Sequence, residues 1–431
     1  MSEPWVCLIG SDRYFIDDVL WIYGDILYSG CKVNAHGENE GFIGCVSKNR
    51  LKYFKLIKGI REVYKLNYHS DDRILVCGKC FLGCFDYSLG KFKWIKGSEV
   101  GLYSLCSHED TSFIGGGLGR IALLNKDRAI CEKKLTIKNS VNEWWVPSIR
   151  GACCLRDKYV IAGDLPKLIS KDSERDFWIC FLDKDLVPEQ CISFGGLKLD
   201  WVFLNSICCD HNYVYFCGCT VSTGFGKEDI VICCLNRRGE IEWCRVYGVK
   251  LSDISNCIKV YDKYLYIAGY SGNNGCLLVI DKRDGDIVEG KLIGAKNRRT
   301  SLLGMKLTRD HFLVCGWTTI HYGKQTGLLM LLPKNLGKIE VGKEEITISK
   351  WNPRSKEWWP RVRYLESTIE KAEVFTYKKF SVVEKTPEIL FSSSFSLVRH
   401  VASPTAILRT ISVSAARKVT SLDYFNLLLE K

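Results

Sequence analysis

The stretch that decides the fold is residues 256–294, NCIKVYDKYLYIAGYSGNNGCLLVIDKRDGDIVEGKLIG. It contains four short apolar segments. The first leads through an Asp-containing turn to a second that ends in a small residue and Gly269, and a loop, a third and a fourth segment follow. Each segment alternates or is wholly apolar, and the turns carry Asp, Asn or Gly, which is the pattern of strands joined by tight turns. The stretch therefore predicts a four-stranded antiparallel sheet.

The same order of segments recurs in seven copies along the chain. A glycine closes the second segment of each copy, with an average spacing of about 48 residues: Gly30, Gly78, Gly116, Gly163, Gly218, Gly269 and Gly316. This period is close to that of propeller blades and long for solenoid repeats. Four short strands repeated radially also leave few exposed sheet edges. We expect an all-β protein whose residues 1–342 form a β-propeller of about seven four-stranded blades.

Closure of such a ring often uses a strand from the other terminus. Residues 5–10, WVCLIG, precede the first complete copy and are similar to two fourth segments, KLIG at 291–294 and RVYG at 245–248. We expect residues 5–10 to seal the last blade. The alternative is that residues 337–341 supply that strand and the N-terminal piece stacks outside it.

Residues 343–431 form an extension of different composition, without glycine or cysteine. SKEWWPRVRYLESTIEKAEVF indicates a helix around residues 360–372, while VFTYKKFSVVEK and EILFSSSFSLVR alternate like strands. We expect an extension of mixed structure that docks on the propeller or on another protein. Docking on the propeller is favoured, because an aromatic-rich segment has apolar surface to bury.

Two turns carry a family resemblance. DKRDGDI at 281–287 and LNRRGEIEW at 235–243 resemble the turn-and-tryptophan pattern of quinoprotein-type, PQQ-like propeller repeats. The resemblance covers the propeller only. It implies that fold but no quinone site, since no match to that family's quinone and calcium ligands is found. No cofactor is therefore expected. WD40 signatures are absent, because no copy ends in Trp-Asp.

Cysteine is abundant, with 22 residues, whereas Met occurs three times and Gln twice beside 26% charged residues. This thermophile-like composition favours a heat-adapted intracellular protein, in which some thiols could be paired. Cys77, Cys217 and Cys315 precede marker glycines, where other copies have Ser or Ala, so they are interpreted as filling small buried positions. The adjacent pairs at 153–154, 208–209 and 233–234 face opposite sides of a strand and are likewise interpreted as packing.

The usual signatures of location and catalysis are missing. The first residues do not resemble a secretory signal and no apolar run reaches about 18 residues, so we expect a cytoplasmic protein without membrane contact. No nucleophile elbow, Walker loop or zinc-protease motif occurs. Cys77, Cys80 and Cys84 could hold zinc, but no fourth ligand has suitable spacing. We expect no metal and no catalytic residues, and a non-catalytic role is favoured over an enzyme.

One face of the disc is the candidate binding surface. The loops that enter each first strand and those that join second and third strands should emerge there together, and they hold aromatic and basic residues of the kinds that dominate binding hot spots. These are Trp144, Trp145, Trp201, Phe203, Phe225, Tyr270, Arg298, Arg299, Trp317, His321 and Tyr322. The competing interpretation is that Trp144, Trp201 and Trp317 fill gaps between blades.

Three functions remain open. The favoured one is a non-catalytic interaction scaffold that binds another macromolecule, a protein partner or larger assembly, through this face. The second is a small-ligand binder or enzyme that uses the mouth of the central channel. The third is a nucleic-acid-associated protein, in which a phosphate backbone contacts an exposed outer strand. That strand carries Lys48, Arg50, Lys52, Lys55, Lys58 and Arg61, with Lys65 nearby, in a chain of net charge +12.

Overall fold

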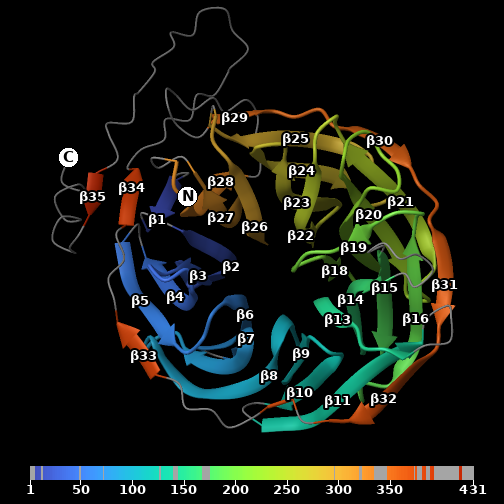
Figure 1. Cartoon of the computed structure of the whole chain (residues 1–431), viewed down its shortest axis with the longest axis horizontal. Coiled ribbons are helices and arrows are strands. Elements are labelled where there is room, and N and C mark those ends of the chain that lie inside the picture. Colours follow the sequence, from blue (N-terminus) through green and yellow to red (C-terminus); the bar gives the residue numbers. More distant parts are fainter. Residues whose placement is uncertain are drawn as a thin grey trace, which may run out of the picture.

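The computed structural model describes residues 5–10, 13–47, 50–70, 72–125, 128–138, 144–166, 175–295, 297–319, 323–333, 347–372, 374–375, 381–384, 389–392 and 417–419. Within these ranges the chain forms strands and no helix. Seven antiparallel sheets stand around a common axis, so the predicted all-β propeller is confirmed (Figure 1).

Five of the blades have four strands or strand positions in the expected order. Blade 1 comprises β2 (Tyr14–Ile22), β3 (Asp25–Val33), β4 (Asn39–Ser47) and β5 (Arg50–Lys58). Blade 4 comprises β13 (Ser148–Leu155), β14 (Lys158–Pro166), β15 (Arg175–Leu182) and β16 (Pro188–Gly195). Blade 5 has a divided first strand, β17 (Asp200–Trp201) and β18 (Ile207–Cys209), then β19 (Tyr213–Thr220), β20 (Asp229–Asn236) and β21 (Ile241–Gly248). Blade 6 comprises β22 (Asp253–Tyr261), β23 (Tyr264–Ser271), β24 (Asn274–Asp281) and β25 (Ile287–Gly294). Blade 7 comprises β26 (Thr300–Leu307), β27 (His311–Thr318), β28 (Thr326–Pro333) and β1 (Trp5–Ile9).

Blades 2 and 3 share a long strand. Blade 2 comprises β6 (Val63–Ser70), β7 (Arg73–Asp86) and the first half of β8 (Lys91–His108); blade 3 comprises the second half of β8 with β9 (Thr111–Gly116), β10 (Arg120–Asn125), β11 (Arg128–Lys138) and β12 (Trp144–Trp145). β7 reverses direction near Cys80, whose φ is 67°. The N–H of Tyr87 donates to the carbonyl of Asp72 (2.9 Å), so the two ends of β7 lie side by side and supply two strands of the blade.

The N-terminal strand lies in the last blade. β1 pairs antiparallel with β28, with Cys7 opposite Leu329. The competing segment, residues 337–341, lies outside the described residues. The first and last parts of the propeller are therefore joined within one sheet.

The marker glycines have a common structural cause. In six blades the chain at the start of the first strand approaches the glycine so closely that an added Cβ would meet a backbone carbonyl oxygen, at 1.8 Å from Ile254 O for Gly269 and 2.0 Å from Ser301 O for Gly316. In blade 5 a Cβ on Gly218 would first meet the Phe177 ring, at 2.5 Å. A register shift follows in the first strand, as between Ser255 and Cys257. Only glycine allows this approach, which explains why the repeat is legible in the sequence.

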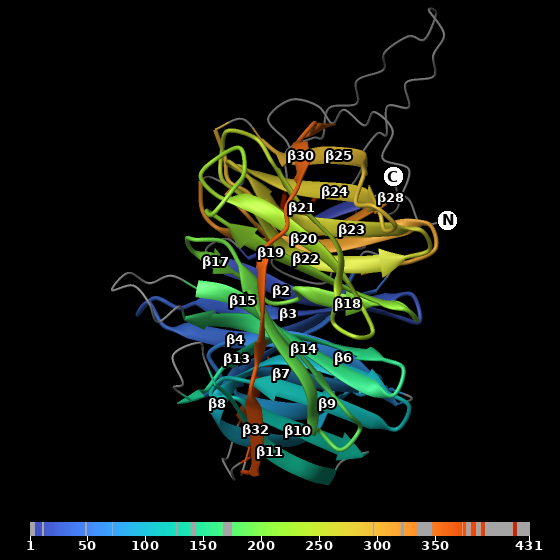
Figure 2. The ribbon, with the colours of Figure 1, turned by 90° about the vertical axis from the view of Figure 1, so that its right-hand side faces the viewer.

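The C-terminal extension forms a belt around the rim of the disc, seen edge-on in Figure 2. Its strands pair antiparallel with the outer strands of six blades in reverse order. They are β29 (Thr347–Lys350) on blade 6, β30 (Arg354–Glu357) on blade 5, β31 (Arg361–Leu365) on blade 4, β32 (Ser367–Lys371) on blade 3, β33 (Ser381–Glu384) on blade 1 and β34 (Ile389–Ser392) on blade 7, where β35 (Arg417–Val419) extends it. The helix expected around residues 360–372 is wrong: β31 and β32 are there, because the outer strands β16 and β11 offer backbone hydrogen bonds to an extended segment.

Apolar side chains of the belt pack at five of the grooves between blades. Trp351 is 4% exposed and lies in the core between blades 5 and 6, and Trp358 packs on the core between blades 4 and 5. Ile348, Ile369 and Val374 occupy equivalent positions at other junctions. The belt is thus held by apolar burial as well as by strand pairing.

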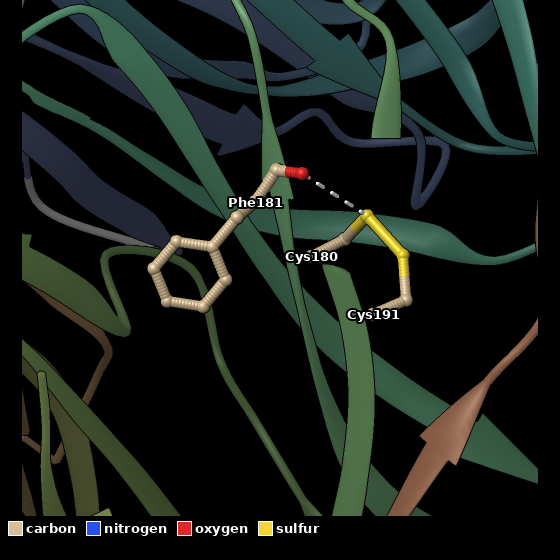
Figure 3. Close-up of a disulfide and its surroundings, with 3 residues drawn as sticks. All are labelled: Cys180, Phe181 and Cys191. Carbon is tan, nitrogen blue, oxygen red and sulfur yellow. Dashed lines mark hydrogen bonds between the residues drawn. A yellow bond between two sulfur atoms is a disulfide. The ribbon is translucent and has the colours of Figure 1, made fainter. Parts of the chain in front are cut away.

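Two disulfides join third and fourth strands in adjacent blades. Cys180–Cys191 links β15 to β16 (Figure 3), and Cys233–Cys244 links β20 to β21. The adjacent cysteines do face opposite sides, since Cys233 and Cys234 lie in different core clusters. The interpretation of Cys233 as packing alone is wrong, because a cross-strand partner lies directly opposite it.

Candidate functional site

Two cavities open on the face where the loops entering first strands and the loops between second and third strands emerge, called the loop face below. One lies between blades 7 and 1, has a volume of about 520 Å³ and is called the basic pocket. It is lined by Arg13, Asn297, Arg298, Arg299, Trp317, Thr319, Gly323, Lys324 and Gln325. The other lies between blades 4 and 5, with a volume of about 410 Å³, and is called the tryptophan pocket. It is lined by Arg150, Asp164, Arg175, Leu199, Trp201, Val202, Phe203 and Leu204.

Three predicted residues meet in the basic pocket. Arg298, Arg299 and Trp317 lie together there, whereas His321 and Tyr322 lie outside the described residues. Trp317 is half-buried and its ring packs edge-on against Phe15 of blade 1, with centroids 6.2 Å apart. This tryptophan both fills a gap between blades and forms a pocket wall.

Backbone hydrogen bonds fix the basic loop. The N–H of Arg299 donates to the Thr319 hydroxyl (2.8 Å), and the N–H of Thr319 donates to the carbonyl of Arg299 (2.8 Å). Asn297 has a φ of 59°, in the left-handed region that Asn tolerates in turns. The two arginines are therefore presented from a tied turn, which lowers the entropy lost when a ligand binds them.

The electrostatics of the basic pocket are one-sided. Four basic residues line it, and among the residues that the structure describes no acidic residue does. Within the described part of the chain, Arg13, Arg298 and Arg299 have no ion pair. Such a pocket favours a negatively charged group, and a guanidinium can hold a carboxylate or phosphate through two hydrogen bonds.

The tryptophan pocket, unlike the basic pocket, has an acidic residue beside its arginines. Asp164 lies between its two arginines, with Oδ2 at 2.5 Å from Arg175 Nη1 and Oδ1 at 3.7 Å from Arg150 Nε. Its exposed apolar surface comes from Phe203, which is 37% exposed, beside the half-buried Trp201. Because the arginines already have a counter-charge, this pocket offers mainly aromatic surface.

Other predicted residues do not join either pocket. Trp145, with Trp144 before it in β12, pairs with Ile137 at the end of blade 3. Phe225 is covered by the belt, since the Arg354 guanidinium lies 4.5 Å from its ring centroid. Tyr270 is half-buried near the end of β23.

Sequence reasoning missed three arginines of these pockets, Arg13, Arg150 and Arg175. Arg13 lies in the loop that enters the first strand of blade 1, the loop type already singled out on other blades. Applying that rule to the first copy identifies Arg13. Arg150 and Arg175 lie in or beside strands of blade 4, and only the fold brings them to Trp201.

The proposed basic strand is not a free edge. Its outer strand β5 is paired with β33 of the belt, where Lys55 lies opposite Glu384. Lys55 is 7% exposed, and Lys52 pairs with Asp25 (3.1 Å). The expectation that these residues form an exposed strand is therefore wrong for Lys55, while Lys48 lies outside the described residues.

Buried carboxylates lie beneath the loop face. Asp253 is fully buried and accepts a hydrogen bond from the N–H of Val249 (2.7 Å), and Asp229 accepts from the N–H groups of Phe225 and Gly226. Burial raises the pKa of Asp253 to about 6, and the charges of Asp229 and Glu228 act in the same direction. Burial also raises the pKa of Asp229. Asp253 thus stabilises the loop that enters blade 6, and Asp229 stabilises the loop between β19 and β20 of blade 5.

Two of the three thiols considered for a metal are buried in the propeller. Cys77 and Cys84 are buried on β7, and the Cys77 thiol donates to the carbonyl of Leu102 (3.3 Å). Over the described ranges, no three His, Cys, Asp or Glu side chains are grouped so that they could hold a metal ion. A search of the described residues also finds no helix with the length and apolarity needed to cross a membrane.

Comparison with known proteins supports the fold. No protein-family model matches the sequence, and neither does any curated protein. The WD40 β-propeller domain of Doa1 is similar in structure, with a TM-score of 0.50 and 11% sequence identity over 78% of this chain and 98% of that chain. The computationally designed Ika8 protein has a TM-score of 0.43 and 8% identity, covering 75% of this chain and 98% of its own. The similarity to the WD40 domain shows a β-propeller fold.

Proposed function

We propose that this β-propeller is a non-catalytic interaction scaffold that binds an acidic segment of another protein on its loop face. The observation that carries the proposal is the basic pocket, where four basic residues, and no acidic residue of the described ranges, line the cavity beside Trp317. Arginine and tryptophan are the residues most enriched at binding hot spots. An acidic side chain of the partner would pair with Arg298 or Arg299, and its apolar neighbour would contact Trp317.

The tryptophan pocket supports a partner that spans the face. Both of its arginines lie within 4 Å of Asp164, and Trp201 and Phe203 supply its aromatic contact surface. The two pockets lie at blade junctions 7/1 and 4/5, on distant parts of the ring (Figure 1). A partner that reaches both would have an acidic anchor and a separate apolar anchor.

Mild crosslinking in native cells, followed by mass spectrometry, tests the proposal. Wild-type protein is compared with Arg298→Glu/Arg299→Glu and with Lys227→Glu, an exposed charge on the same face outside both pockets. We expect a stoichiometric protein companion, crosslinked near the basic pocket, whose recovery falls at least about tenfold in the double variant and not in the control, since one charge-assisted hydrogen bond contributes about 1.5–3 kcal/mol. Equal recovery with all three proteins would refute a role of the pocket.

The nucleic-acid alternative has weaker support. Its predicted strand β5 is paired with the belt, and Lys52 is already paired with Asp25. In the same experiment, salt-labile nucleic acid that disappears in the double variant would assign the pocket to phosphate backbones instead of protein.

Two further predictions from the sequence, on the lineage of the propeller and on its location in the cell, also stay proposals. The similarity of residues 235–243 and 281–287 to quinoprotein-type repeats supports a propeller of that lineage without its cofactor. The composition supports a heat-adapted protein of the cytoplasm, where two disulfides are compatible with the exception known for hyperthermophiles.

A further inference from the structure

Three lysines gather at the propeller axis, away from the loop-face pockets. Lys65 is on β6, Lys259 on β22 and Lys306 on β26, which are the first strands of blades 2, 6 and 7. These strands surround the axis together with β2 of blade 1, which carries Asp18 between blades 7 and 2 (Figure 1). Lys65 is 9% exposed, while Lys259 and Lys306 are half-buried.

The lysines lie close enough to affect one another. Burial, together with the charges of Lys259 and Lys65, lowers the pKa of Lys306 to about 8, and Asp18 opposes them. Burial also lowers the pKa of Lys65. For Lys259, burial is outweighed by Cys257, Cys208 and Asp18, so its pKa is raised. Asp18 acts on all three lysines, which places their side chains around this one carboxyl group.

The cluster has too few counter-charges. Among the residues that the structure describes, none of the three lysines has an ion pair within 4.0 Å, and Asp18 uses Oδ2 to accept the N–H of Leu66 (3.0 Å). The next carboxyl on β2, Asp17, has a pKa raised to about 8 by burial and by Glu62 and Asp18, so it is largely uncharged at pH 7. Three lysines thus share one carboxyl group, Asp18, so basic groups outnumber acidic ones in the cluster.

We infer that Lys65, Lys259 and Lys306 form a binding site for a compact, doubly charged oxyanion of the phosphate class at the propeller axis. A dianion matches the excess charge, and its oxygens accept hydrogen bonds from ammonium groups on several sides. The half-buried position strengthens these interactions relative to water. Bringing blades 2, 6 and 7 onto one ligand would also tighten the ring.

The test is titration of the full-length protein with inorganic phosphate at low ionic strength, by calorimetry. We expect saturable binding at one site. Lys259→Met and Lys306→Met keep the apolar stem, remove the charge, and should each weaken phosphate binding by roughly tenfold or more. Lys291→Met is the matched control, since Lys291 is 7% exposed but already paired with Glu289 (3.0 Å).

The basic-pocket variant separates this site from the loop face. Phosphate affinity should be unchanged in Arg298→Glu/Arg299→Glu; loss there, with retention in the lysine variants, would place the anion at the rim and overturn the inference. Absence of saturable binding by the wild-type protein would also overturn it. Titration with a sugar phosphate then distinguishes sources, because tighter binding than inorganic phosphate indicates a phosphorylated metabolite.

A second measurement does not depend on ligand. Without phosphate and at low salt, Lys306→Met should melt at a higher temperature than wild type, because repulsion and the burial of a charge are relieved. Added phosphate should raise the wild-type melting temperature and reduce this difference. A variant that melts lower and responds to phosphate like wild type would contradict the site.

Discussion

Truncation of Trp351 tests whether the belt is anchored by burial. Its side chain is 4% exposed between blades 5 and 6, and the backbone N–H of Trp351 donates to the carbonyl of Gly290 (2.9 Å). Gly290 permits this contact, since a Cβ there would lie 2.3 Å from Trp351 O. Trp351→Ala removes the indole and leaves the backbone pairing possible.

The expected magnitude follows from area and polarity. Burying a tryptophan removes about 200 Å² from water, which at about 25 cal/mol per Å² contributes roughly 5 kcal/mol. The indole Nε1 has no hydrogen-bond partner among the described residues, which costs about 2 kcal/mol. We therefore expect Trp351→Ala to lower the free energy of attaching the belt by about 3 kcal/mol.

Hydrogen exchange measures this change directly. Amides of β29 and β30 should exchange faster in Trp351→Ala, by roughly a hundredfold for 3 kcal/mol, while amides of the central strands β23 and β24 change little. Trp359→Ala is the control, because Trp359 is 66% exposed in the same segment. Equal acceleration by both variants would refute anchoring by burial and leave strand pairing alone to hold the belt.

Two further predictions concern pH and redox state. The pKa of Asp253 is raised from 3.8 to about 6, so its contribution to stability is present below pH 4 and is lost as the pH rises through 6. In urea titrations across this range, the free energy of unfolding of Asp253→Asn should fall less steeply with pH than that of wild type. Parallel plots of this free energy against pH would contradict the raised pKa. Alkylation of the unfolded, unreduced protein should label 18 of the 22 cysteines and all of them after reduction, as mass spectrometry will show; 22 labelled before reduction would exclude both disulfides.

The propeller is predictable from sequence because its cause is local and repeated. Every blade has a glycine at a crowded position of its second strand, in six blades because the first strand approaches it, as at Gly269 opposite Ile254 O, so the period is visible in the sequence. The belt has no such mark. Residues 361–371 carry charges at spacings that also suit a helix, and the unpaired edges of β16 and β11 decide in favour of strands. Non-local backbone pairing here overrides local preference.

The candidate site is predictable only in part for a related reason. The loop type identified Trp317, Arg298 and Arg299, which do meet in one pocket. The same rule selected Phe225, but Arg354 of the belt covers it. Which loop residues become neighbours depends on the blade junction, and which stay accessible depends on a segment more than 100 residues away in sequence.

The belt also determines how a partner can bind. Six outer strands are already paired, so on those blades an extended peptide could add only to a short belt strand, as β35 does on β34. Side chains on the flat faces of the disc offer the other mode of recognition. On the loop face, Arg13, Arg298 and Arg299 lie in one pocket and have no ion pair within the part of the chain that the structure describes, which is why an acidic partner is the complement that we propose.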